Sequence, residues 1–168
     1  IQKINNPKEI LLKWYGTDDR NHPGVSMFLK RGNYIISGRP TLFNNYRCNE
    51  NNIYDLTPTQ SRELFNYNGW SKIVGFHTRN VPHKGHEYIQ LEALERSTAD
   101  AIYIAPVIGK KKKGDFKSRI IIDCYETLIK NGVYGQFGTV LSGLNTYSRY
   151  SGPREAIFTA ICHKNFWM

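Results

Sequence analysis

The chain of 168 residues carries 23 Lys and Arg against 14 Asp and Glu, which gives a formal net charge of +9. Apolar residues make up 40% and charged residues 22%, proportions that exclude a disordered tract, a collagen-like repeat and a simple coiled coil. No apolar run approaches the roughly 18 to 20 residues that a membrane-spanning helix needs. We therefore expect a basic globular protein, with one domain of ordinary size and an appendage.

The cysteines Cys48, Cys124 and Cys162 have no paired spacing, so neither a disulfide framework nor a zinc site is predicted. We interpret all three as packing residues of a reduced, cytoplasmic protein. The N-terminus lacks a basic start followed by an apolar core, and it has the character of a trimmed chain rather than of a targeting peptide.

The first fifty residues contain only short elements. Two apolar helical stripes come first, and strand-like runs at residues 33–37 and 41–43 follow, joined by a Gly-Arg-Pro turn. The Asn-rich stretch at residues 44–52 has no periodicity and is typical of a loop or a domain boundary. We predict that residues 1–53 form the end of a small β-rich N-terminal domain and its linker.

From residue 54 onward, helical and strand-like patterns alternate. Thr57, followed by Pro58 and by Gln60, predicts the start of a helix that ends near Gly69. Further strands are predicted at residues 73–76, 101–108 and 137–141, and further helices at residues 83–97, at residues 118–131 and from Pro153 onward. This alternation predicts an α/β fold with a doubly wound parallel sheet over residues 54–168.

Two of these helices carry apolar residues that are predicted to face the sheet. In the helix at residues 118–131 they recur with the i, i+3, i+4, i+7 spacing of a buried stripe. In the last helix, the residues expected to face inward are Ile157, Ala160 and Ile161.

The loop after the first strand of this sheet, HTRNVPHKGH at residues 77–86, concentrates groups that bind anions. In open parallel sheets the ligand lies beyond the carboxyl ends of the strands, and the free N–H groups of the following helix favour a phosphate. Arg79 adds a permanent fork of hydrogen-bond donors. The loop therefore predicts a polyphosphate site.

His83 and His86, three residues apart, are expected on one face of the first helical turn, where both rings can donate to one phosphate group. Gly85 between them lets a ligand approach the backbone closely. The alternatives are two titratable rings on a surface turn, or a zinc pair for which the motif offers no clear third ligand. The density of polar groups in the loop favours the phosphate site, and no metal is assigned to protein ligands.

The segment HTRNVPHKGHEY resembles the QTRN-x-x-H-x-x-H segment of the ATP sulfurylase (sulfate adenylyltransferase) family, a relative of nucleotidyltransferases with the HxGH signature. Other segments are similar to the same family, among them HPGVSMFLKRGNYIISG, SRELFNYNGWSKIVGF and SRYSGPREAIFTAICHKNF. The resemblance implies a Rossmann-like catalytic domain at residues 54–168, incomplete at its C-terminus. It also implies an enzyme of sulfate assimilation that transfers AMP from ATP to sulfate, giving adenylyl sulfate and pyrophosphate, or runs in reverse.

Carried over by position, the resemblance implies catalytic and nucleotide-binding roles for Thr78, Arg79, Asn80, His83 and His86. Arg79 is expected at the sulfate and Asn80 at the nucleotide phosphates. The two histidines are expected to stabilise the charge that builds up in the transition state.

Further ligands are predicted outside these five residues. His77, Lys110 and Lys111 are assigned to the nucleotide, and His77 and Arg149 to the acceptor. The lysine run at residues 110–113 is either a solvated loop or a flexible cationic lid over the triphosphate. Arg149 and Arg154 follow the third strand, where each either contacts the nucleotide or pairs with a neighbouring carboxylate or carbonyl.

The expected partners are small molecules: ATP, sulfate or adenylyl sulfate, and pyrophosphate. Mg²⁺ is expected on the β- and γ-phosphates, bound mainly through the nucleotide. No nucleic acid or membrane partner is expected, and a homo-oligomeric full-length protein is left open. A basic nucleic-acid-binding module is the rival reading, but the tyrosines are scattered and no recognition motif accompanies them.

Two departures from the family pattern affect the expected activity. His77 stands where the family has Gln, and a titratable ring leaves open a related nucleotidyltransferase with another oxyanion or a phosphorylated acceptor. The sequence also stops before the family's Gly-Arg-Asp-His loop. We therefore expect this chain alone to be weakly active or an inactive fragment.

Overall fold

The computed structural model describes residues 1–41 and 52–167. Cys48 and most of the strand predicted at residues 41–43 therefore lie outside the described residues. The chain divides into two compact units, one formed by Ile1–Cys48 with Arg149–Phe158 and the other by Asn49–Ser148 with Thr159–Met168. The predicted domain boundary at residue 53 stays a prediction.

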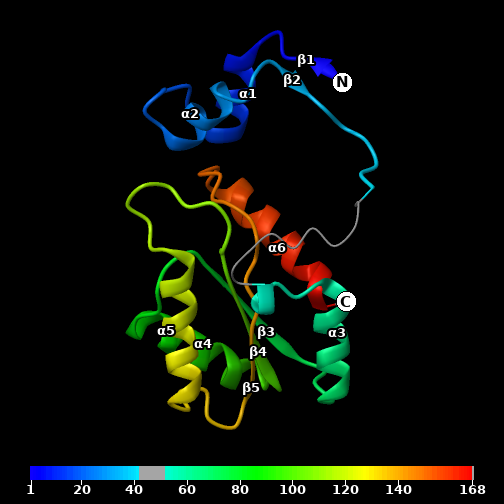
Figure 1. Ribbon diagram of the computed structural model, residues 1–168, viewed down its shortest axis with the longest axis vertical. Coiled ribbons are helices and arrows are strands. Elements are labelled where there is room, and N and C mark those ends of the chain that lie inside the picture. The colour runs from blue at the N-terminus through cyan, green and yellow to red at the C-terminus, as the bar shows by residue number, and fades with distance from the viewer. Residues whose placement is uncertain (42–51, 168) are drawn as a thin grey trace. The chain divides into compact units, whose positions relative to one another are not determined.

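The first unit contains two short helices and a small antiparallel strand pair (Figure 1). Helix α1 spans Pro7–Tyr15, α2 spans Pro23–Leu29, and β1 (Gln2–Lys3) pairs with β2 (Tyr34–Ile35). Both helices predicted from the apolar stripes are present, and each buries one residue of its stripe, Leu11 in α1 and Val25 in α2, whereas Trp14 and Leu29 are exposed. The described part of this unit carries more helix than strand, and its β-rich character stays a prediction.

The second unit is built on a three-stranded parallel sheet with the order β3-β4-β5 (Figure 1). Its elements are η1 (Asn52–Tyr54), α3 (Pro58–Tyr67), β3 (Ile73–Thr78), α4 (Lys84–Ser97), β4 (Ala101–Pro106), α5 (Ser118–Lys130), β5 (Gly138–Leu141) and α6 (Pro153–Trp167), of which α6 runs through both units. The predicted α/β fold with a parallel sheet is confirmed. The helix predicted to begin after Thr57 is also confirmed, because Thr57 Oγ1 accepts a hydrogen bond from Gln60 N at 3.2 Å in a capping box.

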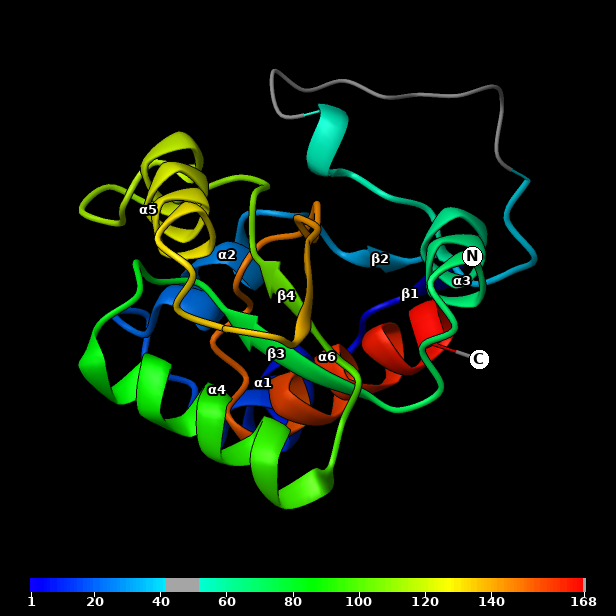
Figure 2. The ribbon, with the colours of Figure 1, turned by 90° about the horizontal axis from the view of Figure 1, so that it is seen from below.

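Helices cover both faces of this sheet, as its doubly wound pattern requires. Along β4, Ile102 and Ile104 pack with residues of α4 and α5, whereas Tyr103 and Ala105 pack with residues of α3 and with Phe166 at the end of α6. The alternation follows from the two-residue period of a strand, which sends successive side chains to opposite faces. Figure 2 shows α4 and α5 following one side of the strands and α3 the other.

The inward face predicted for the last helix is wrong. Ile157 and Ile161 are 61% and 57% exposed, and Ala160 is exposed as well. The buried positions on α6 are Thr159 and His163, which stand one helical turn apart. None of the described helices, α6 included, has the length and apolar character needed to cross a membrane.

Backbone hydrogen bonds continue past the carboxyl ends of the strands. The amide of Val107 donates to the carbonyl of Thr78 at 2.8 Å, which joins the segment after β4 to the end of β3. The amide of Ile108 donates to Leu144 O at 3.0 Å, and the amide of Leu144 donates to Pro106 O at 2.8 Å. The segments that follow all three strands are therefore fixed at one edge of the sheet.

Candidate functional site

The candidate site begins where β3 ends, at Thr78. This residue is buried, and its Oγ1 accepts a hydrogen bond from the backbone amide of Asn80 at 3.1 Å. The bond closes a tight turn, in which a Thr side chain replaces a backbone acceptor. Arg79 and Asn80 are both exposed on this turn. The predicted trio is thus one buried anchor followed by two accessible polar side chains.

His83 forms the N-cap of α4 rather than part of its first turn. Its Nδ1 accepts a hydrogen bond from the amide of Gly85 at 3.1 Å, and its carbonyl accepts from the amide of His86 at 2.8 Å. Because Nδ1 is an acceptor, the proton of a neutral His83 ring is on Nε2. The exposed ring therefore carries its donor on the side opposite the helix.

The two histidine rings lie together at the start of α4. The rings of His83 and His86 are stacked, with centroids 3.9 Å apart and planes inclined by 23°. The ring of His86 also meets Phe76 edge-on at 5.4 Å. Burial and, next, the charge of His83 lower the pKa of His86, while hydrogen bonding to the backbone of Val81 acts in the opposite direction. The His86 ring is therefore neutral at pH 7.

The absence of a side chain at Gly85 makes room for the His83 ring and does not leave the backbone open to a ligand. A Cβ at this position would lie 3.1 Å from Cε1 of His83, closer than most real Cβ contacts. A side chain here would press on the His83 ring, which folds back over the start of the helix. The expected close approach of a ligand to Gly85 has to share that space with the ring.

The lysine run after β4 contains one lysine that is partly buried. Lys111 Nζ donates to the carbonyl of Val107 at 2.6 Å, whereas Lys110, Lys112 and Lys113 are exposed. Burial lowers the pKa of Lys111, the carboxylate of Asp115 raises it, and the positive charge of Arg79 lowers it again. Lys111 and Arg79, from two different loops, therefore place positive charge at the same edge of the sheet.

His77 points to the opposite face of the sheet from Phe76 and His86, as strand alternation requires. Its Nδ1 lies 3.1 Å from the carbonyl oxygen of Ala105 and 2.9 Å from Nε2 of His163 on α6. Burial, with the charge of His77 second, lowers the pKa of His163 to about 4. The structure thus separates His77 from the stacked pair and gives it a buried histidine partner.

The sequence analysis missed His163. The sequence pattern that could have identified it is a pair of polar residues one turn apart, Thr159 and His163, on the buried side of α6. Arg149, the other predicted acceptor ligand, belongs to the first unit. There its guanidinium lies 4.3 Å from the ring centroid of Phe158, and its amide donates to Glu155 Oε1 at 2.6 Å.

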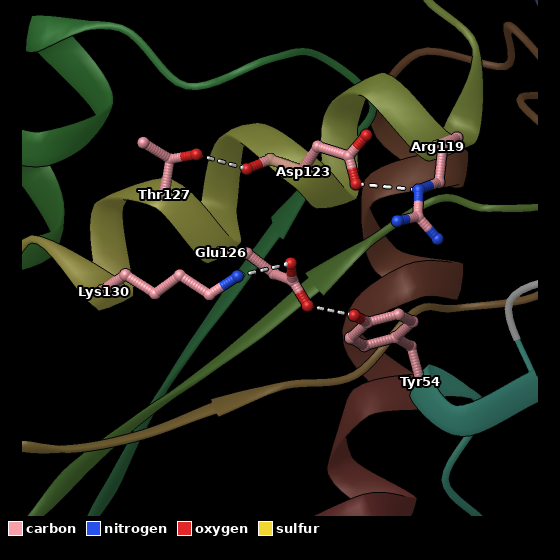
Figure 3. Close-up of polar contacts among 6 residues, drawn as sticks. All are labelled: Tyr54, Arg119, Asp123, Glu126, Thr127 and Lys130. Atoms are coloured by element: carbon pink, nitrogen blue, oxygen red, sulfur yellow. Dashed lines mark hydrogen bonds and ion pairs between the residues drawn. The ribbon is translucent and has the colours of Figure 1, made fainter.

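The segment that enters the second unit is fastened beside the end of β5. The carbonyl of Tyr54 accepts hydrogen bonds from the amide of Gly143 at 2.6 Å and from Ser142 Oγ at 3.1 Å. The hydroxyl of Tyr54 donates to Glu126 on α5, in line with a series of i, i+4 contacts along that helix (Figure 3). This clasp, defined as Tyr54 with Ser142, Gly143 and Glu126, joins η1 to both the sheet edge and α5.

Cation-binding groups of the protein itself are sparse at this edge. Among residues 1–41 and 52–167, no group of three His, Cys, Asp or Glu side chains is arranged to hold a metal ion. The two described cysteines, Cys124 and Cys162, are free thiols. The arrangement at the end of β3 offers hydrogen-bond donors and positive charge to an anion.

Comparison with known proteins gives one consistent result. Residues 52–167 match the family described as ATP-sulfurylase. The sulfate adenylyltransferases of Thermococcus onnurineus (strain NA1) and Pyrococcus abyssi (strain GE5 / Orsay) are 45% and 44% identical over 159 residues, which are 95% of this chain and 41% of each relative. The sulfate adenylyltransferase of Ignicoccus hospitalis is 41% identical over 162 residues, which are 92% of this chain and 40% of the relative.

One solved structure supports the fold alone. "Hexameric APS kinase from Thiobacillus denitrificans" matches with a TM-score of 0.52 and 18% sequence identity, covering 70% of this chain and 23% of that chain. The curated relatives are much longer than this protein, since it spans about 41% of the first two.

Proposed function

The chain belongs to the ATP-sulfurylase family, and from this we propose that it binds ATP at the carboxyl end of β3 and serves the transfer of AMP from ATP to sulfate, or the reverse. The observation that carries the proposal is the stacked pair of His83 and His86 at the N-terminus of α4, directly after the turn that exposes Arg79 and Asn80. This arrangement presents donors and positive charge within one short loop.

In the proposed reaction, a sulfate oxygen attacks the α-phosphorus of ATP. The bond that forms joins this oxygen to phosphorus. The bond that breaks joins the α-phosphorus to the oxygen bridging it to the β-phosphorus, and its electron pair leaves with pyrophosphate. Negative charge on the phosphoryl oxygens has to be stabilised in the transition state, and fixed donors typically contribute about 3 kcal/mol each.

Each residue of the loop fits a distinct part of this task. Arg79 is always charged and exposed, which suits it to bind sulfate through two parallel hydrogen bonds. Asn80 supplies an amide for the nucleotide phosphates. The Nε2–H of His83 is the donor left after Nδ1 caps the helix, and it would bind a phosphoryl oxygen.

Lys111 and Lys110 would contact the outer phosphates of the nucleotide. Lys111 is held by the carbonyl of Val107, so its ammonium is a fixed charge and not part of a freely moving lid. The exposed Lys110, Lys112 and Lys113 retain the lid role proposed for this run. Mg²⁺ would enter with ATP and neutralise the leaving pyrophosphate.

His77 and Arg149 are the residues proposed to bind the acceptor. His77 replaces the Gln of the resembled motif, and its Nδ1 already lies within hydrogen-bonding distance of Ala105 O and His163 Nε2. A contact between His77 and the acceptor would therefore use Nε2. Arg149 stays a proposed acceptor ligand. The cytoplasmic location and the exclusion of nucleic-acid partners stay predictions.

Titration calorimetry of the purified chain with MgATP tests the binding step. Replacing Arg79 or His83 by Ala should weaken binding at least tenfold. Arg96→Ala is the matched control, because Arg96 is an exposed arginine in the last turn of α4, at the end of the helix opposite to His83. Equal affinities in all variants would refute the site. Steep salt-dependent binding to random DNA, with no affinity for ATP, would support the nucleic-acid reading instead.

ATP formation from adenylyl sulfate and pyrophosphate tests the chemical step. Measured with this chain, it is expected to be weak, and Arg79→Ala should abolish whatever turnover is present. Release of pyrophosphate with sulfate, molybdate, selenate and phosphorylated acceptors distinguishes sulfate from the other acceptors. Turnover with a phosphorylated acceptor but not with sulfate would reject the sulfate assignment while keeping the nucleotidyltransferase reaction.

A further inference from the structure

Behind the stacked histidines, between α4 and α5, lie three buried polar atoms with no hydrogen-bond partner among the described residues. They are His86 Nδ1, Gln90 Nε2 and the hydroxyl of Tyr125. Gln90 and Tyr125 are both 0% exposed. A buried donor or acceptor without a partner costs roughly 1 to 3 kcal/mol, so three of them in one region require an explanation.

Gln90 is a neighbour of each of the other two residues, of His86 along α4 and of Tyr125 on α5. His86 and Gln90 are four residues apart on α4, which places them on one face of the helix, one turn apart. Burial raises the pKa of Tyr125 to about 12, and the side chains of Thr78 and Gln90, which lie within reach of hydrogen bonding to its hydroxyl, act in the opposite direction. The region therefore borders both His86 and the buried anchor of the exposed turn, Thr78.

The orientation of Gln90 is fixed from one side. The hydroxyl of Tyr134 donates to Gln90 Oε1 at 2.8 Å in a buried contact. With Oε1 occupied by this donor, the amide nitrogen of Gln90 is the end of the side chain that has to find an acceptor. Burial raises the pKa of Tyr134 well above its ordinary value, so the phenol stays protonated and keeps this role over the physiological pH range.

We propose that Gln90 is a positioning residue for His86, acting through one buried water molecule that it shares with Tyr125. The water oxygen accepts from Gln90 Nε2 and from the hydroxyl of Tyr125, and one water hydrogen is donated to His86 Nδ1. A buried water typically makes about three such bonds to polar groups that are otherwise unsatisfied. The three atoms supply two donors and, in the Nε2-protonated tautomer of the ring, one acceptor.

This arrangement determines which nitrogen of His86 carries the proton. A hydrogen bond received at Nδ1 places the proton on Nε2, so the neutral ring offers an Nε2–H donor, as His83 does. Two stacked rings in the same tautomeric state can each direct an Nε2–H donor at one anion. The value of this donor for ATP rests on the proposed function, whereas the tautomer itself can be measured without any ligand.

The test is the tautomeric state of His86, read from the ring-nitrogen chemical shifts of the ¹⁵N-labelled chain at pH 7.5. The parent chain should show Nε2 protonated and Nδ1 unprotonated. Gln90→Leu keeps the volume of the side chain but removes the amide, and it should shift His86 toward a mixture of tautomers. Leu94→Ala is the control for a loss of packing, because Leu94 is buried one turn further along α4 and its truncation destabilises the fold but removes no polar group.

An Nδ1-protonated ring in the parent chain, or the same tautomer in the parent and in Gln90→Leu, would overturn the proposal. If Gln90→Leu does not fold, Tyr125→Phe removes one partner of the water and should shift the tautomer in the same direction. A crystal structure should show density within hydrogen-bonding distance of all three atoms, and a dry contact there would also overturn it. Affinity for MgATP should fall about three- to tenfold in Gln90→Leu, the effect of one hydrogen bond. A parent chain that binds no ATP would reject the proposed function and leave the tautomer result in place.

Discussion

The contact between His77 and His163 makes the stability of the second unit depend on pH. His163 is 5% exposed, and its pKa is lowered from 6.5 to about 4 by burial and by the neighbouring His77. Its neutral form is therefore the one that the folded state favours. In the unfolded chain the same ring binds a proton near pH 6.5. The stabilising contribution is thus complete above pH 6.5 and is lost as the pH falls from 6.5 toward 4.

The expected magnitude follows from this difference in pKa. Between pH 6.5 and 4, each unit of acidification removes up to about 1.4 kcal/mol, because the unfolded state binds one more proton than the folded state. Lowering the pH from 7 to 5 should therefore reduce the free energy of unfolding by about 2 kcal/mol through His163 alone. His86 contributes in the same direction, since its pKa is lowered as well.

Urea denaturation at several pH values measures this effect. The free energy of unfolding of the parent chain should fall more steeply between pH 7 and 5 than that of His163→Gln, which keeps a polar side chain but cannot titrate. The difference between the two slopes isolates His163 from the carboxylates, which also titrate in acid. His22→Asn is a control for the loss of an imidazole outside this pair, because Asn can replace His22 as the N-cap of α2. Parallel slopes for the parent and His163→Gln would refute the buried, neutral His163.

Three further substitutions test other parts of the structure. Thr57→Ala removes the N-cap of α3 and should cost about 1 kcal/mol in urea denaturation, and an unchanged midpoint would contradict the capping box. Gly138→Ala would place its Cβ against the indole of Trp70, and a cost of about 1 to 3 kcal/mol is expected in the same assay; a neutral result would mean that the indole has room to move. Lys111→Ala should weaken MgATP binding about tenfold, more than Lys113→Ala, because Lys111 is partly buried, held by Val107 O and close to Arg79; equal effects in calorimetry would favour a general charge effect of the run.

The sequence predicted correctly those features that depend on residues close together along the chain. The capping box at Thr57 and the apolar stripe of α5 depend on neighbours within one or two turns, and both are present in the structure, with Ile121 and Tyr125 buried. The alternation of strands and helices predicted the parallel sheet for the same reason. The histidines at the start of α4 were also expected to lie together, and they do.

The sequence was insufficient where packing decides the outcome. The residues of α6 are apolar on several sides, so no periodicity identifies the face that meets the sheet, and the prediction that Ile161 faces inward is wrong. The contact of His77 with His163 joins residues 86 positions apart, and a single sequence carries no signal for such a pair. Gln90 was missed because one polar residue on a helix is normally solvated, whereas this one is fully buried.

The backbone bonds between Thr78, Val107 and Leu144 act as a cross-brace at the carboxyl edge of the sheet. A conformational change that moved these segments apart would have to break the backbone hydrogen bonds that join them. The brace extends to Gly109, where any added side chain would collide with the backbone of Thr146. Motion in this loop is therefore expected at the exposed Lys110, Lys112 and Lys113, because Lys111 is held by the carbonyl of Val107. Variants that alter the dynamics of this loop should be sought at residues 110 and 112–114, while the backbone beneath them tolerates little change.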